Sequence, residues 1–201
     1  EIGTGDWSSD VCSSDLIGII KIEGETGMNE QVDKEQFLMP DECDFEKISK
    51  FILDIFEEKK GFCYIDSNIS FEKISTIREM CKVETLRYGH ATGSHIIYKY
   101  SQMHSADIDG VVIINLHSSK RVAYIQALIA KENEVAKEIL YHLKMTLNRN
   151  RVYTIKAVFT GRKKEVDLVN FFEKFGFIKE AILKGESYFG DLHVYSLYEE
   201  E

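Results

Sequence analysis

Residues Leu168–Ile178, with the sequence LVNFFEKFGFI, give the clearest indication of how this chain folds. Their apolar side chains recur at helical spacing and predict a helix over residues 165–175. Gly176 can adopt the left-handed conformation in which many helices end. Phe177 then opens an apolar run that predicts a strand over residues 177–183, with the phenylalanine buried beneath a sheet.

The segments before and after this helix alternate between strand and helix patterns. Residues 131–147 have helical spacing, and the runs around them are rich in Val, Ile and Tyr and separated by polar or glycine-containing turns. The runs at residues 85–88, 94–100, 110–116 and 121–129 predict consecutive antiparallel strands. Further strands are expected at residues 152–159 and 192–198.

The N-terminal third alternates short strands with amphipathic helices. Asp44 is expected to cap a helix whose apolar residues fall on one face, with Gly61 just past its end. Ser70 precedes a second run with helical spacing, which ends near Cys81. The short strands are expected at residues 36–39 and 62–65.

Composition limits what such a chain does. It has 201 residues, 44% of them hydrophobic, and its 25 basic and 34 acidic residues give a formal net charge of −9. This charge argues against nucleic acid or an anionic membrane as a partner, and no apolar run reaches the roughly 20 residues of a spanning helix. The four cysteines have neither disulfide nor zinc spacing, so we expect a cytoplasmic protein with reduced thiols and no metal site.

The C-terminal sequence resembles the last third of the GNAT family of acyl-CoA N-acyltransferases. In that family a helix ends in a Tyr-Glu-Lys-Leu-Gly-Phe-like phrase, a strand and an acidic-glycine turn follow, and a Tyr-Ser-Leu-like strand closes the fold. The corresponding segments here follow Leu168–Ile178 and are Glu180–Leu183, Tyr188–Asp191 and Val194–Leu197. The order of the preceding elements also fits, so we expect one α+β domain over residues 32–198, with a mixed, mostly antiparallel sheet flanked by helices.

The resemblance implies an N-acetyltransferase that transfers an acetyl group from acetyl-CoA to a small-molecule or peptide amine. In the family, acetyl-CoA lies between the fourth and fifth strands, here residues 121–129 and 152–159. Backbone N–H groups at the start of the next helix bind its pyrophosphate. The implied cofactor-binding residues are Leu128, Ile129, Ala130, Lys131, Glu134, Val135, Ala136 and Lys137.

Several positions depart from the family pattern. Residues 130–137 contain no glycine, whereas the family uses spaced glycines to bring backbone close to phosphate. Phe172 stands where a tyrosine often protonates the departing thiolate, Glu165 where an asparagine commonly begins the helix, and Gln126 where some members carry a carboxylate base. These departures leave a second hypothesis open, a catalytically inactive GNAT-fold module that binds a ligand or a partner protein.

Other polar residues near the implied site could supply the missing chemistry. Glu132 is a candidate base, and Tyr188 and Tyr195 are candidate proton donors. Residues 162–164, with the sequence RKK, could hold a nucleotide phosphate. Each also has a purely structural interpretation, because acidic residues at helix starts complement the helix dipole, strand tyrosines pack in cores and lysines are solvated.

The first residues of the chain differ in composition from the rest. Residues 1–16 are rich in Ser and Asp, lack basic residues and contain Trp7, the only tryptophan. Residues 6–16 can be back-translated into a string that resembles a common sequencing-library adapter, so we interpret residues 1–16 as translated adapter. Two interpretations stay open for residues 17–31, a translated leader preceding a start at Met28 or an additional strand.

Overall fold

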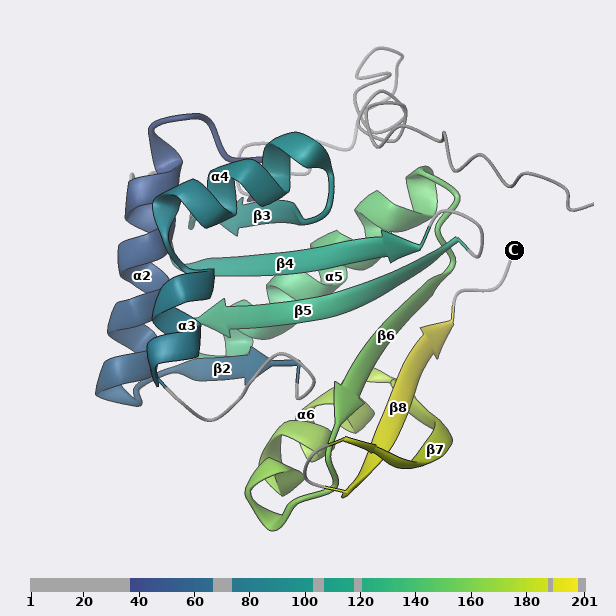
Figure 1. Ribbon diagram of the computed structural model, residues 1–201. Helices are drawn as coiled ribbons and strands as arrows, with labels where there is room; N and C mark the ends of the chain where they lie inside the picture. The colour runs from purple at the N-terminus through teal and green to yellow at the C-terminus, as the bar shows by residue number, and fades with distance from the viewer. Residues whose placement is uncertain (1–36, 67–73, 103–106, 118–120, 188–189, 199–201) are drawn as a thin grey trace, which may run out of the picture.

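The computed structural model describes residues 37–66, 74–102, 107–117, 121–187 and 190–198. The predictions for residues 1–36, for Ser70 and for Tyr188 lie outside these ranges. The described residues form one sheet between two layers of helices (Figure 1). The helices are α2 (Asp44–Glu58), α3 (Ile74–Met80), α4 (Val83–Thr92), α5 (Asn133–Arg149) and α6 (Val166–Phe175), with a 3₁₀ turn at Lys163–Glu165.

The sheet has eight strands and is mostly antiparallel. Its order is β1-β3-β4-β5-β6-β8-β7, β2 also pairs with β5, and β5 with β6 is the parallel pair. This confirms the expected mixed α+β architecture. The strands are β1 (Phe37–Leu38), β2 (Phe62–Ile65), β3 (Ile96–Tyr100), β4 (Gly110–His117), β5 (Val122–Ala130), β6 (Thr154–Phe159), β7 (Ile178–Ser187) and β8 (Gly190–Tyr198).

Each face of the sheet buries its own apolar cluster. Leu128 of β5 belongs to the cluster beneath α5 and α6, whereas its neighbour Ile129 belongs to the cluster beneath α2, α3 and α4. Both side chains are at most 1% exposed. A sheet covered on both faces has strands that are apolar on both sides, which explains why the central strands appear as continuous apolar runs.

The C-terminal helix and its stop confirm the prediction made from Leu168–Ile178. Gly176 follows α6 with a φ of 113° and ends it in the left-handed conformation. Phe177 is 2% exposed and packs with the cluster beneath α5 and α6. Helix α5 begins at Asn133, two residues later than expected, because residues 131 and 132 form the turn that leaves β5.

The strand expected at residues 85–88 is wrong, because these residues lie within helix α4. Leu86 and Gly89, three positions apart, are its buried residues, while Tyr88 is 73% exposed. This spacing is helical, and Gly93 ends the helix with a φ of 71°. A run of four residues that contains a β-branched and an aromatic side chain is too short to distinguish the periodicity of a helix from that of a strand.

The expected ends of α2 also need correction. Cys43 holds the capping position, and Asp44 is the first helical residue. The buried Asp44 carboxylate instead accepts the Asp41 N–H at 2.8 Å and the Lys99 ammonium at 2.6 Å. At the other end, Lys59 stops the helix in the left-handed conformation with a φ of 51°, and Gly61 follows two residues later with a φ of 82°.

Candidate functional site

Strand β5 changes its neighbour part-way along its length. It pairs with β6 only over Val122–Tyr124. Ile113 and Ile114 of β4 lie opposite residues 127 and 125, so Gln126 is an additional residue, a β-bulge. A bulge bends its strand and increases the local twist, and beyond it β6 turns away from β5 (Figure 1). We call the opening between these diverging strands the fork.

The fork is occupied by the chain's own strand β2. Phe62–Ile65 pair antiparallel with Ala127–Ala130, so pairing with β2 begins directly after the bulge. The backbone N–H of Asp66 also donates to the carbonyl of Gln126 itself, at 2.8 Å. The C-terminal half of β5 therefore has a strand on both sides, β4 and β2.

Tyr64 connects β2 to the other arm of the fork. Its hydroxyl donates to the Val158 carbonyl at 3.1 Å and accepts the Val158 N–H at 2.8 Å. The side chain is 1% exposed, and burial raises the pKa of Tyr64 well above its usual range. The neutral phenol thus satisfies both backbone groups that β6 presents toward the fork at this position.

Glu165 bonds to Thr160, the residue that directly follows β6. Its carboxylate accepts the Thr160 backbone N–H at 2.7 Å and the Thr160 hydroxyl at 2.8 Å, and it pairs with Arg162 at 3.1 Å. The residue is 6% exposed. Glu165, which corresponds to the family's asparagine, therefore anchors the loop that follows β6. It also holds Arg162, the arginine of residues 162–164, against the protein.

Phe172 lies in an aromatic cluster and has no exposed surface. Its ring centroid is 4.9 Å from that of Tyr64, 5.0 Å from that of Phe177 and 5.5 Å from that of Phe159. Tyr195, a candidate proton donor, packs edge-on against Phe159 and is 4% exposed. Both residues contribute to the core beneath α5 and α6.

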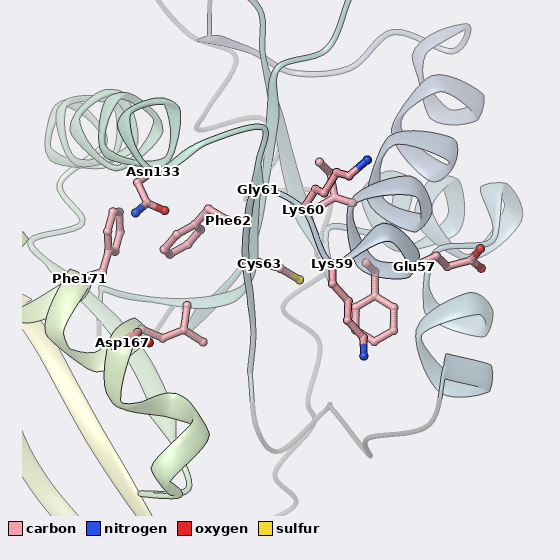
Figure 2. A pocket seen from close by; sticks show the side chains of 12 residues that line it. Glu57, Lys59, Lys60, Gly61, Phe62, Cys63, Asn133, Asp167 and Phe171 are labelled. Atoms are coloured by element: carbon pink, nitrogen blue, oxygen red, sulfur yellow. The ribbon is translucent and has the colours of Figure 1, made fainter.

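A cleft of about 660 Å³ lies where the fork meets the surface. The end of α2, the start of β2, the start of α5 and α6 form its walls (Figure 2). Phe62 points from β2 toward Phe171, and their ring centroids are 4.3 Å apart. Lys59 and Lys60 lie on the α2 side, where Lys60 pairs with Glu58 at 3.0 Å.

The first four implied cofactor-binding residues lie on β5 and in the turn after it. Leu128, Ile129 and Ala130 are buried and lie between β2 and β4. The Lys131 backbone N–H donates to the Asp109 carbonyl at 2.9 Å, and its ammonium pairs with the Asp109 carboxylate at 2.5 Å. Their role in binding a cofactor stays a prediction.

The other four implied residues belong to the first turns of α5. Val135 and Ala136 are buried against the sheet, whereas Glu134 and Lys137 form an exposed ion pair at 2.8 Å. The carbonyl of Glu132, the candidate base, accepts the Ala136 N–H at 3.1 Å. These roles also stay predictions.

The described part of the chain shows neither a candidate metal site nor a candidate membrane-spanning helix. Its His, Cys, Asp and Glu side chains form no group of three or more that could hold a metal ion. None of the helices within the described ranges is long and apolar enough to cross a membrane.

Solved structures of low sequence identity share this architecture. A protein described as a GNAT-family acetyltransferase from Desulfovibrio desulfuricans matches with a TM-score of 0.59 at 16% identity, over 81% of this chain and 97% of that one. The chain has the GNAT fold. Spermidine N-acetyltransferase from Vibrio cholerae matches with a TM-score of 0.57 at 14% identity, over 81% and 94%. No protein-family model and no curated protein matches the sequence.

An enzyme that acts on another kind of acceptor has the same fold. Ribosomal-protein-alanine N-acetyltransferase from Brucella melitensis matches with a TM-score of 0.57 at 11% identity, over 81% of this chain and 99% of that one. At such identity the likeness shows the fold alone.

The local sequence of β2 predicts a strand, but it does not predict the place of this strand in the sheet, beside β5. A strand over residues 62–65 is confirmed, yet its local pattern does not specify its neighbour. The sequence did contain one indication of this position. Phe62 and Tyr64, on one face of the strand, are aromatic, and Cys63 and Ile65, on the other face, are also apolar. A short strand that is apolar on both sides belongs inside a covered sheet rather than at a solvated edge.

Proposed function

We propose that this chain is a GNAT-fold binding module that does not transfer acetyl groups. The observation that carries the proposal is the filled fork, in which β2 pairs with β5 and the Tyr64 hydroxyl bonds to Val158. In the family that the sequence resembles, acetyl-CoA lies between the corresponding strands. The same backbone groups cannot pair with β2 and with a cofactor at once.

Removing β2 from the fork carries a large free-energy cost. It would expose Phe62 and Tyr64, which are 4% and 1% exposed, and each such aromatic side chain contributes about 2 kcal/mol by burial. The two hydrogen bonds of Tyr64 contribute about 1 kcal/mol each, so the total is on the order of 6 kcal/mol. Such a cost weakens a dissociation constant of about 1 µM to about 20 mM.

The side chains around the fork support the same proposal. Phe172 has no proton to donate and lies in the core, and the buried Tyr195 packs against Phe159. The carboxylate of Glu165 is committed to Thr160 and Arg162. At Phe172 and Glu165, two of the positions where the sequence departs from the family, the side chain thus has a structural role.

N-acetyl transfer from acetyl-CoA to an amine is the second candidate function. Its support is the fold shared with N-acetyltransferases and the divergence of β5 from β6 after Tyr124. In this case β2 would leave the fork, and acetyl-CoA would contact residues 128–131 and 134–137. Glu132 would be the candidate base.

Titration of acetyl-CoA into the full chain by isothermal calorimetry distinguishes the two functions. We expect no saturable heat up to about 1 mM ligand, because β2 occupies the fork. Hydrogen exchange at the amides of Cys63 and Tyr64, measured with and without acetyl-CoA, should be unchanged. Saturable binding accompanied by faster exchange at these amides would overturn the proposal and favour the transferase.

A further inference from the structure

Strand β2 has an edge that pairs with none of the described strands, because it pairs with β5 on one side only. In an antiparallel pair, residues that bond to the partner strand alternate with residues whose backbone groups point away from it. The Asp66 N–H donates to the Gln126 carbonyl in the register that β2 and β5 share. Counting back by two, Tyr64 and Phe62 also bond to β5, whereas Cys63 between them does not.

The other neighbour of β5 gives the same alternation. The Lys131 N–H donates to the Asp109 carbonyl in the register of β4 and β5, so Ile129, two residues earlier, bonds to β4. Ile129 is also the residue opposite Cys63. Each residue has one backbone N–H and one C=O, so Ile129 has none left for Cys63. The Cys63 N–H and C=O therefore point into the fork, where no described strand pairs with them.

The cleft of about 660 Å³ at the mouth of the fork lies beside this edge. Phe62 and Cys63 both line it, although consecutive side chains of a strand point to opposite faces. Figure 2 shows Phe62 pointing toward α6 and Cys63 pointing toward α2. A cleft lined by both residues lies along the edge of the strand rather than above or below it.

The two walls of the cleft carry charges of opposite sign, Lys59 on the α2 side and Asp167 on α6 (Figure 2). Neither residue has an ion pair within the described ranges. The other two charged residues that line the cleft, Glu57 and Lys60, are already in ion pairs. The remaining helical side chains of the walls are apolar and half-buried, apart from that of Asn133: Ile55, Phe56, Leu168 and Phe171.

We propose that the mouth of the fork binds an extended peptide segment of a partner protein, which adds a strand to the free edge of β2. In this mode of recognition, main-chain hydrogen bonds provide affinity and alternate side chains enter pockets on the two faces. Side chains that point toward α2 then lie beside Lys59, and those that point toward α6 lie beside Asp167. A segment with an acidic and a basic residue on opposite faces complements both charges. The inference rests on the proposed function, because it names the partner of the binding module.

Titration of the peptide Val-Glu-Val-Val-Lys-Val, blocked at both ends, into the full chain tests the proposal by calorimetry. Its glutamate and lysine are three positions apart and so point to opposite faces of an extended segment. We expect saturable one-to-one binding with a Kd below about 1 mM. A second peptide has N-methyl groups on its two central valines, one of which must direct its N–H toward β2. It keeps every side chain and should bind about tenfold more weakly.

Hydrogen exchange shows where the peptide binds. In the free chain the Cys63 amide should exchange faster than the Tyr64 amide, because only the latter bonds to β5. Saturating peptide should slow exchange at Cys63 about tenfold, because its N–H gains a partner.

A matched pair of variants tests the charge complementarity. Asp167→Lys brings a positive charge to the wall that faces the peptide's lysine and should weaken binding about threefold or more. Glu84→Lys is the control, because it makes the same change of charge at an exposed residue of α4 that does not line the cleft. It should leave the affinity unchanged.

Each remaining outcome has a defined meaning. Absence of saturable binding, equal affinity of the N-methylated peptide, unchanged exchange at Cys63, or equal affinities of the two variants would overturn the inference. The measurements on the unchanged chain keep the test valid if Asp167→Lys fails to fold. Acetyl-CoA binding with faster exchange at Tyr64, alongside peptide binding to the free chain, would overturn the proposed function alone.

Discussion

Tyr64 and Tyr98 are both buried tyrosines, but their hydroxyl groups differ in their surroundings. Tyr64 bonds to both backbone groups of Val158, whereas the buried Tyr98 hydroxyl has no partner among the described residues. Tyr98 instead packs by its ring, whose centroid is 4.7 Å from that of Phe37. The two residues therefore form a natural pair for measuring what the hydroxyl bridge across the fork contributes.

We expect Tyr64→Phe to lower the free energy of unfolding by about 1–3 kcal/mol, because it leaves the Val158 N–H and carbonyl buried without a partner. Tyr98→Phe removes a hydroxyl that bonds to none of the described residues, so its effect should stay within about 0.5 kcal/mol. Urea unfolding followed by circular dichroism measures both values. Equal effects of the two substitutions would show that the bridge to β6 contributes nothing.

At the level of elements, the docking of β2 depends on the residue that precedes it. Gly61 has a φ of 82°, and a Cβ atom there would lie 2.5 Å from the Ala130 oxygen and 2.8 Å from the Lys131 oxygen. Gly185 also has a positive φ, of 66°, but a Cβ atom there would meet no other atom within 4 Å. The two glycines share a positive φ, in which glycine is unstrained, and differ in the space around them.

Gly185→Ala should therefore destabilise the protein by about 1 kcal/mol, the cost of a side chain in the left-handed region. Gly61→Ala should cost about 3 kcal/mol or more, because the end of β5 must also move. Hydrogen exchange should become faster at residues 62–65 in Gly61→Ala only. If both variants lose the same stability and keep slow exchange at β2, close packing against β5 is not what restricts position 61.

Helix α4 shows that length alone does not make a helix predictable, because α4 has ten residues, as α6 does. The apolar residues of α6 recur at helical spacing, whereas α4 buries only Leu86 and Gly89. Within α4, Thr85 and Tyr88 favour a strand by composition. Its packing against α2 and β3 selects the helix, and that packing is not visible in the local sequence.

At the level of the whole molecule, the two apolar clusters share one sheet. Leu143 of α5 belongs to one cluster and Ile52 of α2 to the other, and both are at most 1% exposed. Because neighbouring residues of β5 belong to different clusters, loss of the sheet disrupts both clusters at once. The described residues should therefore unfold as one cooperative unit.

We expect a single thermal transition, with equal calorimetric and van't Hoff enthalpies. Leu143→Ala and Ile52→Ala should each lower the free energy of unfolding by about 2–5 kcal/mol and shift the whole transition. Differential scanning calorimetry measures both quantities. Two transitions, of which each variant shifts only one, would show that the two faces of the sheet are independent.

Apart from α4, the sequence by itself determined the order of elements, the helix stop at Gly176, the antiparallel strands β3 to β5 and the GNAT-like arrangement, because these depend on periodicity and on local backbone preferences. It also located the departures at Glu165 and Phe172. Only the tertiary structure decided which strand fills the fork, because pairing between Phe62–Ile65 and Ala127–Ala130 joins segments about sixty residues apart in sequence. Local patterns do not specify such a partner, and the proposed function rests on this pairing.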